Sequence, residues 1–383
     1  MSRDRVKAIV LYQPGSLQED VWKIRPEATG APGVVDNQIV NDTALPSEGE
    51  SESEPQRSTL YLLTDRSVLQ SIDAETGRTN WSRIVGNPNR PALGPTICSK
   101  YVAIVNGSVL YFLDVGTGET LSQQRLTRPP ISSVAMTDDW TYVPAADGTI
   151  MALNLDAPET NWSYASGVAV EVPPVITRDT VAWSTRYGQL YMGQKSTGRV
   201  TRRFDAGSAS AVPPTYWPPY IYTSSLNGYV NAIHERSGVA VWRFSSGSPI
   251  YEPVVSFEKN LYVITDLGGM YCLAKDGSKQ WYADGITKML AASPARVFAV
   301  DRFNRLVSLD RSTGSLLGTM PLFEQKVQLI NMVNDRIYVC TEKGLLQCLH
   351  EIGQEEPIIH SAPEEETPED AAGNANQATD IRN

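Results

Sequence analysis

The sequence predicts an all-β protein, an eight-bladed β-propeller whose blades are four-stranded antiparallel sheets. Three observations carry this prediction: a repeat of about 40 residues, two turn positions in each repeat that favour glycine, and proline-containing segments between the repeats. Proline is excluded from a central ladder but suits the entry to a strand. A single blade cannot bury both faces, so neighbouring blades must stack and the ends of the ring must meet.

The repeat is clearest at residues 220–247, YIYTSSLNGYVNAIHERSGVAVWRFSSG. This stretch reads as a strand, a tight turn at Asn227-Gly228, a second strand, a turn at Ser237-Gly238 and a strand that carries Trp242. Gly and Asn at such turns tolerate the positive φ that a tight hairpin needs. One position of the middle strand recurs in register through eight copies: Ser71, Phe112, Ala152, Met192, Ala232, Cys272, Ser308 and Cys348.

The ends of the chain predict how the ring closes. The last copy stops after its third strand, at LLQCLHEIG. Trp22 precedes residues 33–40, GVVDNQIV, by the spacing that separates the fourth-strand Trp from the next first strand elsewhere. We therefore expect residues 20–25 to complete blade 8, an N-terminal strand that closes the ring, and residues 33–40 to begin blade 1. Residues 41–57 become an acidic loop insertion in blade 1, on the face of the Thr-Gly turns. A single propeller domain over residues 1–353 and a disordered acidic tail over 354–383 follow.

Charge and hydropathy exclude several classes of function. The formal net charge is −10, but the acidic residues are concentrated in the tail and in residues 34–58. The remaining body has no cluster of Lys and Arg, which argues against nucleic-acid binding. No apolar run approaches the length of a transmembrane segment. The N-terminus, MSRDRVKAIVLYQPG, has no recognisable cleavage site, so a cytoplasmic chain is expected if Met1 is the true start.

The segment IDAETGRTNW at 72–81 resembles the repeat of the PQQ-type (quinoprotein-like) β-propellers, and HERSGVAVW, LDRSTG and AKDGSKQW match it in part. The resemblance covers roughly residues 59–353 and implies the propeller fold. One branch of that superfamily comprises dehydrogenases that hold pyrroloquinoline quinone and calcium, many with an adjacent Cys-Cys pair. The other resembles the BamB-type propellers of bacterial outer-membrane protein assembly, which are non-enzymatic scaffolds.

The second branch fits better, because the chain has little inserted sequence for a cofactor lid and no Cys-Cys dipeptide. We expect a monomeric, non-catalytic scaffold that binds a protein or peptide on one face, with no cofactor and no metal site. The resemblance implies the bacterial cell envelope. A quinone-dependent dehydrogenase and a carbohydrate-binding propeller remain the alternatives.

The sequence also predicts roles for individual residues. The fourth-strand tryptophans are expected to pack between blades: Trp22, Trp81, Trp162, Trp242 and Trp281. Aromatic residues near loops are candidates for partner binding, because such sites enrich Trp and Tyr: Tyr216, Trp217, Tyr220 and Trp140. His234 and His350 replace Asp at a turn-stabilising position, and none of the three histidines has zinc-ligand spacing. Cys98, Cys272, Cys340 and Cys348 are expected to be small buried residues, with Cys340 opposite Leu346.

Overall fold

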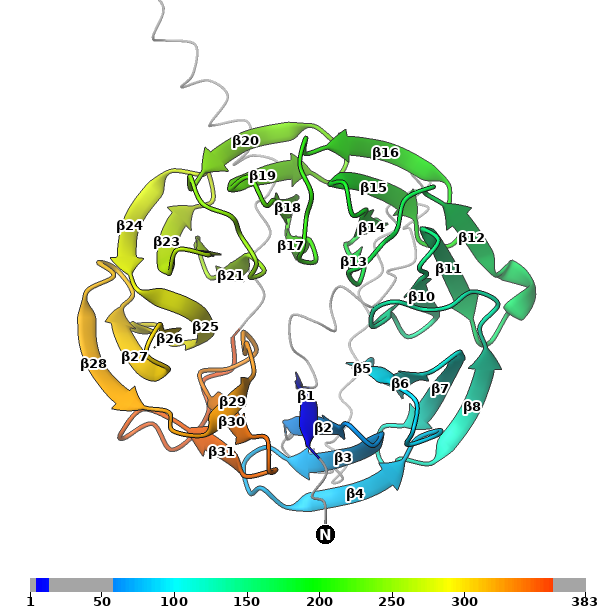
Figure 1. Cartoon of the computed structure of the whole chain (residues 1–383), viewed down its shortest axis with the longest axis horizontal. Coiled ribbons are helices and arrows are strands. Elements are labelled where there is room, and N and C mark those ends of the chain that lie inside the picture. Colours follow the sequence, from blue (N-terminus) through cyan, green and yellow to red (C-terminus); the bar gives the residue numbers. More distant parts are fainter. Residues whose placement is uncertain (1–4, 14–57, 361–383) are drawn as a thin grey trace, which may run out of the picture.

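The computed structural model describes residues 5–13 and 58–360, which form a ring of eight antiparallel sheets around a central axis (Figure 1). Seven sheets have four strands and one has three described strands, so the predicted eight-bladed propeller is confirmed. The strands of each blade follow one another outward from the axis, and we call them A to D in that order. The described helical content is one 3₁₀ turn, η1 (Pro158–Thr160).

The first four blades are complete. Blade 1 contains β1 (Val6–Tyr12), β2 (Thr59–Thr64), β3 (Val68–Asp73) and β4 (Thr79–Ile84). Blade 2 contains β5 (Ala92–Ile97), β6 (Tyr101–Asn106), β7 (Val109–Asp114) and β8 (Thr120–Arg125). Blade 3 contains β9 (Ala135–Met136), β10 (Trp140–Pro144), β11 (Thr149–Asn154) and β12 (Trp162–Ala165). Blade 4 contains β13 (Val175–Ile176), β14 (Thr180–Ser184), β15 (Gln189–Gln194) and β16 (Val200–Asp205).

Blades 5 to 7 are also complete, whereas blade 8 has no described strand D. Blade 5 contains β17 (Thr215–Trp217), β18 (Tyr220–Ser224), β19 (Tyr229–His234) and β20 (Ala240–Ser245). Blade 6 contains β21 (Val255–Phe257), β22 (Asn260–Thr265), β23 (Gly269–Ala274) and β24 (Lys279–Asp284). Blade 7 contains β25 (Ile286–Ala292), β26 (Arg296–Asp301), β27 (Arg305–Asp310) and β28 (Leu316–Pro321). Blade 8 contains β29 (Gln325–Gln328), β30 (Ile337–Thr341) and β31 (Leu346–Leu349).

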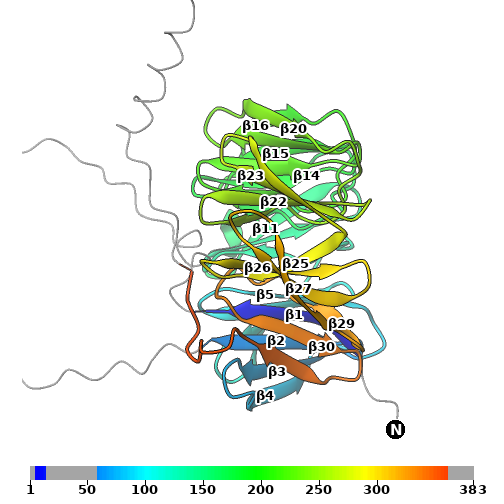
Figure 2. The same cartoon turned by 90° about the vertical axis from the view of Figure 1, so that its left-hand side faces the viewer.

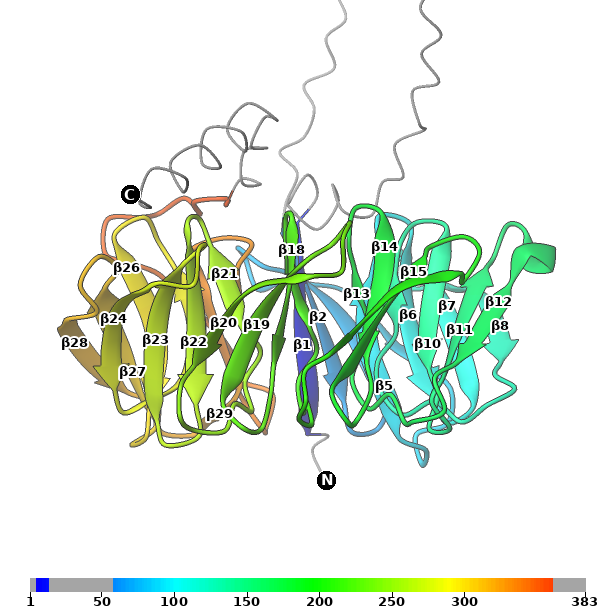
Figure 3. The same cartoon turned by 90° about the horizontal axis from the view of Figure 1, so that it is seen from above.

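The meander gives the ring two distinct faces. Turns between strands A and B and between C and D share one face, which we call the A–B face. Turns between B and C and the links between blades share the other, the B–C face. The amide of Arg5, before β1, donates to the Asp65 carboxylate in a B–C turn at 3.0 Å, so the chain enters on the B–C face. The orange-red C-terminal segment of the described chain runs along the opposite, A–B face (Figure 3).

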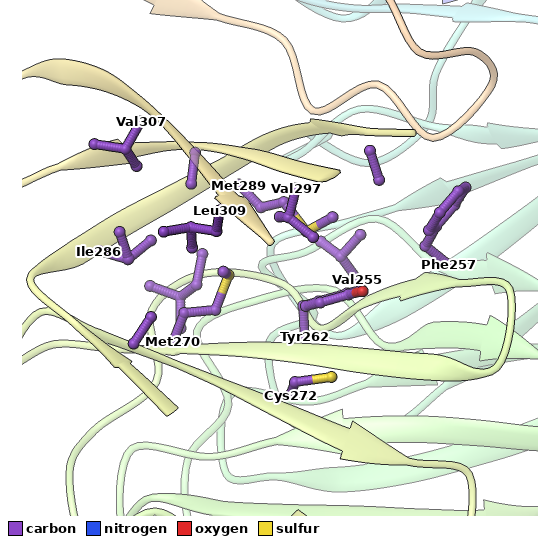
Figure 4. Close-up of a cluster of buried hydrophobic side chains, with 14 of the residues drawn as sticks. Val255, Phe257, Tyr262, Met270, Cys272, Ile286, Met289, Val297, Val307 and Leu309 are labelled. Atoms are coloured by element: carbon purple, nitrogen blue, oxygen red, sulfur yellow. The ribbon is translucent and has the colours of Figure 1, made fainter. Parts of the chain in front are cut away.

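The core lies between the blades. Each blade is a single sheet, and both of its faces bury side chains against the neighbouring blades. The seam between blades 6 and 7 is typical (Figure 4). Tyr262 and Met270 of blade 6 pack with Met289 and Val307 of blade 7 in one buried cluster. Figure 2 shows the blades edge-on, stacked around the ring. This arrangement explains why strands A to C are almost continuously apolar.

The structure corrects the prediction for strand A of blade 1. That strand is β1, which pairs with β2 from Val6 opposite Thr64 to Tyr12 opposite Thr59. The other side of β2 is taken by β3, so residues 33–40 cannot hold the predicted position. Residues 14–57, including 20–25 and 41–57, lie outside the described residues. The insertion between strands A and B of blade 1 is therefore longer than the acidic stretch suggested.

The beginning of the predicted disordered tail is instead ordered. The Arg336 guanidinium, 1% exposed, donates to the carbonyl oxygens of Gln354 and Glu355 at 2.9 and 2.5 Å. The amide of Ile358 donates to the Asp335 carboxylate at 2.9 Å. His360 is buried and its ring lies 4.5 Å from the ring of Phe257 in blade 6. Residues 354–360 therefore join blade 8 to blade 6, and residues 361–383 of the predicted tail lie outside the described residues.

Candidate functional site

Four of the predicted packing tryptophans join adjacent blades through one repeated contact. In each, the indole Nε1 of strand D donates to a backbone carbonyl in the C–D turn of the next blade. The pairs are Trp81 with Val115, Trp162 with Lys195, Trp242 with Lys275 and Trp281 with Arg311, at 3.1, 3.0, 2.8 and 2.9 Å. These rings are therefore structural. Trp22 lies outside the described residues.

The turn glycines allow this contact. At Gly118 a Cβ would lie 2.4 Å from the Trp81 ring, and at Gly277 it would lie 2.6 Å from the Trp242 ring. Both glycines also have positive φ, of 69° and 84°. Gly is thus required for two reasons. Any other residue would be strained at this positive φ, and its side chain would displace the neighbouring indole. The turn glycine of the repeat is therefore the packing site for the tryptophan of the preceding blade.

The structure contradicts the premise that the candidate partner-binding tryptophans are exposed. Trp217 and Trp140 are each 5% exposed. Trp217 lies beneath the Lys275 ammonium, 5.4 Å from the ring centroid, and Trp140 belongs to a buried cluster between blades 3 and 4. Their positions beside loops suggested exposure, but the short A–B turns fold these rings under neighbouring elements. The described structure offers neither ring to a partner.

The two candidate tyrosines are half-buried and engaged within the ring. The Tyr216 hydroxyl donates to the Glu235 carboxylate at 2.8 Å, and burial raises the pKa of that phenol. Glu235 also accepts from the amide of Asp179 at 2.9 Å, which joins blade 5 to the A–B turn of blade 4. Tyr220 stacks edge-on against His234, with ring centroids 5.9 Å apart. Both tyrosines therefore have structural contacts on the A–B face.

The turn-stabilising role predicted for His234 is confirmed. Its Nδ1 accepts from the amide of Ser237 at 3.4 Å, as the Asp73 carboxylate accepts from the amide of Thr76 at 2.7 Å in blade 1. All four cysteines are free thiols, and Cys340 pairs with Leu346 as predicted. Cys348 is exposed, contrary to its predicted burial. The reason is that no described strand D covers this position of blade 8.

Several large apolar side chains are exposed on the B–C face of blades 4 to 8. Tyr187, Leu267 and Phe303 stand at the tips of three B–C turns and are 65, 79 and 69% exposed. Tyr251 and Phe323, on the links that enter blades 6 and 8, are exposed on the same face. We call these five residues the apolar arc. Large apolar side chains exposed on one face mark a candidate interaction surface, so the arc is the candidate functional site.

The other turn tips of the same face carry no large apolar side chain. The turn-tip position that carries Tyr187, Leu267 and Phe303 is occupied in blades 1, 2, 3, 5 and 8 by Arg66, Gly107, Asp147, Asn227 and Lys343. Because all eight turns have the same backbone role, this difference is not required by the fold. The repeat thus provides its own comparison, and it distinguishes the apolar turn tips of blades 4, 6 and 7 from the tips of the other five blades.

Phe303 marks the centre of the most elaborate part of the arc. Arg302 and Arg305 lie over its ring, with guanidinium carbons 5.9 and 5.1 Å from the centroid. Both arginines are oriented by carboxylates: Arg302 by Asp284 and Arg305 by Asp301, each at 2.7 Å. Burial opposes ionisation of Asp301, but hydrogen bonds from Arg305 and nearby amides lower the pKa of that carboxyl. The site combines an aromatic ring with oriented guanidinium groups.

An open pocket of about 330 Å³ lies beside Phe303, in the seam between blades 6 and 7. The link between these blades is Gly285 alone, because β24 ends at Asp284 and β25 begins at Ile286. Links of this kind are longer elsewhere, for instance residues 246–254 between β20 and β21. The short link leaves this end of the seam uncovered. Tyr282 and Leu316 form part of the pocket wall.

The described residues contain neither a metal-binding cluster nor a membrane-spanning helix. Residues 5–13 and 58–360 contain no group of three or more His, Cys, Asp and Glu side chains able to hold a metal ion. Within the same ranges, no helix has the length and apolar character needed to cross a membrane.

Comparisons with known proteins agree with this architecture. A family model described as outer membrane protein assembly factor BamB matches residues 65–212 and 226–356. Comparison with curated proteins gave no match. Among solved structures, BamB from Moraxella catarrhalis aligns with a TM-score of 0.61 at 14% identity, over 76% of this chain and 93% of that chain.

Other propellers align about as well. Quinohemoprotein alcohol dehydrogenase from Comamonas testosteroni aligns with a TM-score of 0.58 at 13% identity, over 74% of this chain and 68% of that chain. The C-terminal WD40 domain of Sif2 aligns with a TM-score of 0.63 at 11% identity, over 77% of this chain and 93% of that chain. These identities show the fold alone. The family follows from the sequence match across most of the ring: the chain belongs to the BamB family of PQQ-like β-propellers.

Proposed function

We propose that this protein is a non-catalytic scaffold that binds a partner polypeptide at the apolar arc on its B–C face. The observation that carries the proposal is the difference between the turn tips of that face. Three turn tips in blades 4, 6 and 7 carry Tyr187, Leu267 and Phe303, where the other five blades carry a charged residue, asparagine or glycine. Covering side chains of this size gains about 1.5–3 kcal/mol each, which favours an occupant that buries them.

The surroundings of Phe303 favour a polypeptide over a small ligand. The apolar tips are spread over several blades, so an extended chain can contact them in succession. The Arg302 and Arg305 guanidinium groups are oriented by Asp284 and Asp301 and can donate to backbone carbonyls or carboxylates of a partner. Aromatic and Arg side chains are the residues that dominate protein interfaces. Membership of a family described by outer-membrane protein assembly supports the finer proposal of a role in that process.

Paired variants test the proposal by affinity capture of the partner from the native host. Leu267→Asp with Phe303→Asp places two charges in the apolar arc. Arg66→Asp with Asp147→Lys makes a matched change at the turn tips of blades 1 and 3, outside the arc. We expect the first pair to abolish capture of a defined partner that wild type and the second pair retain. Equal capture by all three proteins would contradict a function centred on the arc.

A second measurement addresses the dehydrogenase alternative. The purified chain is incubated with pyrroloquinoline quinone and calcium, then given an alcohol or an aldose and a dye acceptor. The proposal predicts no dye reduction above the rate with quinone alone. Saturable quinone binding with substrate-dependent dye reduction would overturn the non-catalytic assignment.

A further inference from the structure

The pocket beside Phe303 is an unfilled part of the seam between blades 6 and 7. It lies between β24 of blade 6 and β27 and β28 of blade 7, and its lining includes Ala283, Val307 and Leu316. The inner part of the same seam is packed with buried side chains, as Figure 4 shows. Because all the seams are built from one repeat, the other seams show what normally occupies this space.

In two other seams a pair of aromatic side chains fills the equivalent space. Phe244 lies two residues after the packing tryptophan of blade 5 and contacts Tyr271 of blade 6, with ring centroids 5.2 Å apart. Tyr164 has the same place in blade 3 and contacts Tyr191 of blade 4, with ring centroids 5.8 Å apart. Each pair joins strand D of one blade to strand C of the next.

The seam between blades 6 and 7 has small side chains at both of these positions. Ala283 pairs with Met270 as Phe244 pairs with Val230, so Ala283 is the equivalent of Phe244. In the other blades with a described strand D, this position carries Arg83, Gln124, Tyr164, Phe204, Phe244 and Met320. Val307 takes the place of Tyr271, because each directly precedes the middle position of strand C. The pocket is therefore the space that an aromatic pair fills elsewhere in the ring.

The link between the blades leaves this space open to solvent. Between blades 5 and 6, residues 246–254 cover the end of the seam, and Ile250 of that link is fully buried. Between blades 6 and 7 the link is Gly285 alone. A Cβ at Gly285 would lie 3.1 Å from Nε of Arg302. The Arg302 guanidinium therefore lies beside the link, and the mouth of the pocket is bounded by Arg302 and Phe303 instead of by main chain.

The mouth can receive an acidic group next to an aromatic ring. The Arg302 and Arg305 side chains are 53 and 43% exposed beside the Phe303 ring. Arg302 donates to Asp284 through one nitrogen, and Arg305 uses Nε and one terminal nitrogen on Asp301. A guanidinium has five N–H donors, so both groups keep donors for a carboxylate of a ligand. Guanidinium groups also favour the faces of aromatic rings.

We propose that this pocket binds an aromatic side chain of the partner polypeptide, with a neighbouring acidic residue of the partner at Arg302 and Arg305. The inference rests on the proposed function, because it takes the polypeptide at the apolar arc as the source of that residue. Phe303 belongs both to the arc and to the pocket lining. Leu316, 60% exposed, continues the apolar surface along the pocket wall. The partner ring makes the contact between blades that Phe244 makes within the chain.

A fluorinated dipeptide tests the pocket directly. The probe is N-acetyl-para-fluorophenylalanyl-glutamate amide, and its fluorine resonance is followed as the full chain is added. We expect saturable line broadening with a millimolar dissociation constant, because a ligand of this size makes few contacts. The matching probe with lysine in place of glutamate should bind roughly threefold more weakly or worse, because its ammonium group meets two guanidinium groups.

Variants that fill the pocket locate the binding. Ala283→Phe introduces the side chain that blade 5 has at this position, and Val307→Tyr introduces the side chain of blade 6. Either change should abolish probe binding without lowering the melting temperature, because the ring enters a space that already exists. Gln124→Phe makes the matched change in blade 2, away from the pocket, and should bind as the natural chain does. No saturable binding to the natural chain, equal affinity for the two probes, or binding retained by a folded Ala283→Phe or Val307→Tyr protein would overturn the proposal.

The same variants separate this inference from the proposed function. A photoreactive phenylalanine analogue at Leu267, in the arc but outside the pocket lining, reports partner binding in the native host. Its protein adduct should disappear in the Ala283→Phe background and persist in the Gln124→Phe background. An adduct that persists in the Ala283→Phe background would overturn the pocket proposal and leave the function of the arc standing. No adduct in any background would overturn both.

Discussion

The indole nitrogen of Trp242 in blade 5 donates to the carbonyl oxygen of Lys275 in blade 6 at 2.8 Å, and the indole ring rests on Gly277 of the same turn. Replacing Trp242 with Ala removes this hydrogen bond and the packing of the ring. Because the ring is only half-buried, we expect a loss near the lower end of the range for such truncations, about 3 kcal/mol of unfolding free energy. Urea denaturation measures it, and a loss below about 1 kcal/mol would contradict a structural role for this ring.

Gly118 tests the equivalent contact between blades 1 and 2 from the side of the glycine. An Ala side chain there would lie 2.4 Å from the Trp81 ring and would require a φ of 69°. Gly118→Ala should lower the free energy of unfolding by about 2–4 kcal/mol, since crowding adds to backbone strain. Gly247 has a φ of 74° with no described atom near its Cβ position, so Gly247→Ala should lose only about 1 kcal/mol. Equal losses would mean that the indole does not need the glycine.

Much of the ring could be predicted from the sequence because the repeat fixes both the strands and their neighbours. The column from Ser71 to Cys348 identified eight middle strands, and the structure confirms all eight. The prediction for strand A of blade 1 was wrong because residues 6–12 and 33–40 both have strand-like sequences. Only tertiary pairing with β2 decides between them.

The candidate site was harder to predict. The Trp217 ring is close in sequence to a loop but lies beneath Lys275, a residue of another blade, which local sequence does not reveal. The sequence does contain a signal for the apolar arc, at the turn tips of the repeat. Reading the turn-tip residue down the repeat gives Tyr187, Leu267 and Phe303 where the other copies carry a charged residue, asparagine or glycine. Departures from the repeat were informative at the turn tips rather than at the aromatic corner around Trp217.

His360 makes stability depend on pH. Burial lowers the pKa of its imidazole, against smaller opposing effects of the Met332 carbonyl and of the Asp335 and Glu258 carboxylates. In the unfolded chain the imidazole titrates near pH 6.5. Below that value the unfolded state binds more protons than the folded state, so the free energy of unfolding falls as the pH is lowered. Above it this contribution is level.

The variant His360→Asn isolates this effect. Unfolding free energies of wild type and variant are compared between about pH 7.5 and 5.5. We expect wild type to lose more stability than the variant over this interval. Parallel pH profiles would contradict a buried neutral imidazole at this position.

Arg336 holds the ordered end of the described chain. It is buried, pairs with Asp335 at 3.8 Å and donates to two carbonyl groups of residues 354–355. Arg336→Ala leaves Asp335 as an uncompensated buried charge, so a loss of about 3–5 kcal/mol is expected, together with faster proteolysis near residue 354. Arg128→Ala, which breaks an exposed pair with Asp147, should lose at most about 1 kcal/mol. Similar effects of the two changes would refute the anchoring role of Arg336.

Site-specific photocrosslinking tests the proposed function most directly. A photoreactive phenylalanine analogue is placed at Phe303 in the apolar arc and, as a control, at Asp147 in blade 3, outside the arc. Both positions are turn tips on the same face, so the reactive group is equally accessible in the two proteins. We predict a discrete protein adduct from position 303 in native cells and none from position 147. No adduct at 303, or the same adduct from both positions, would contradict a partner site at the apolar arc.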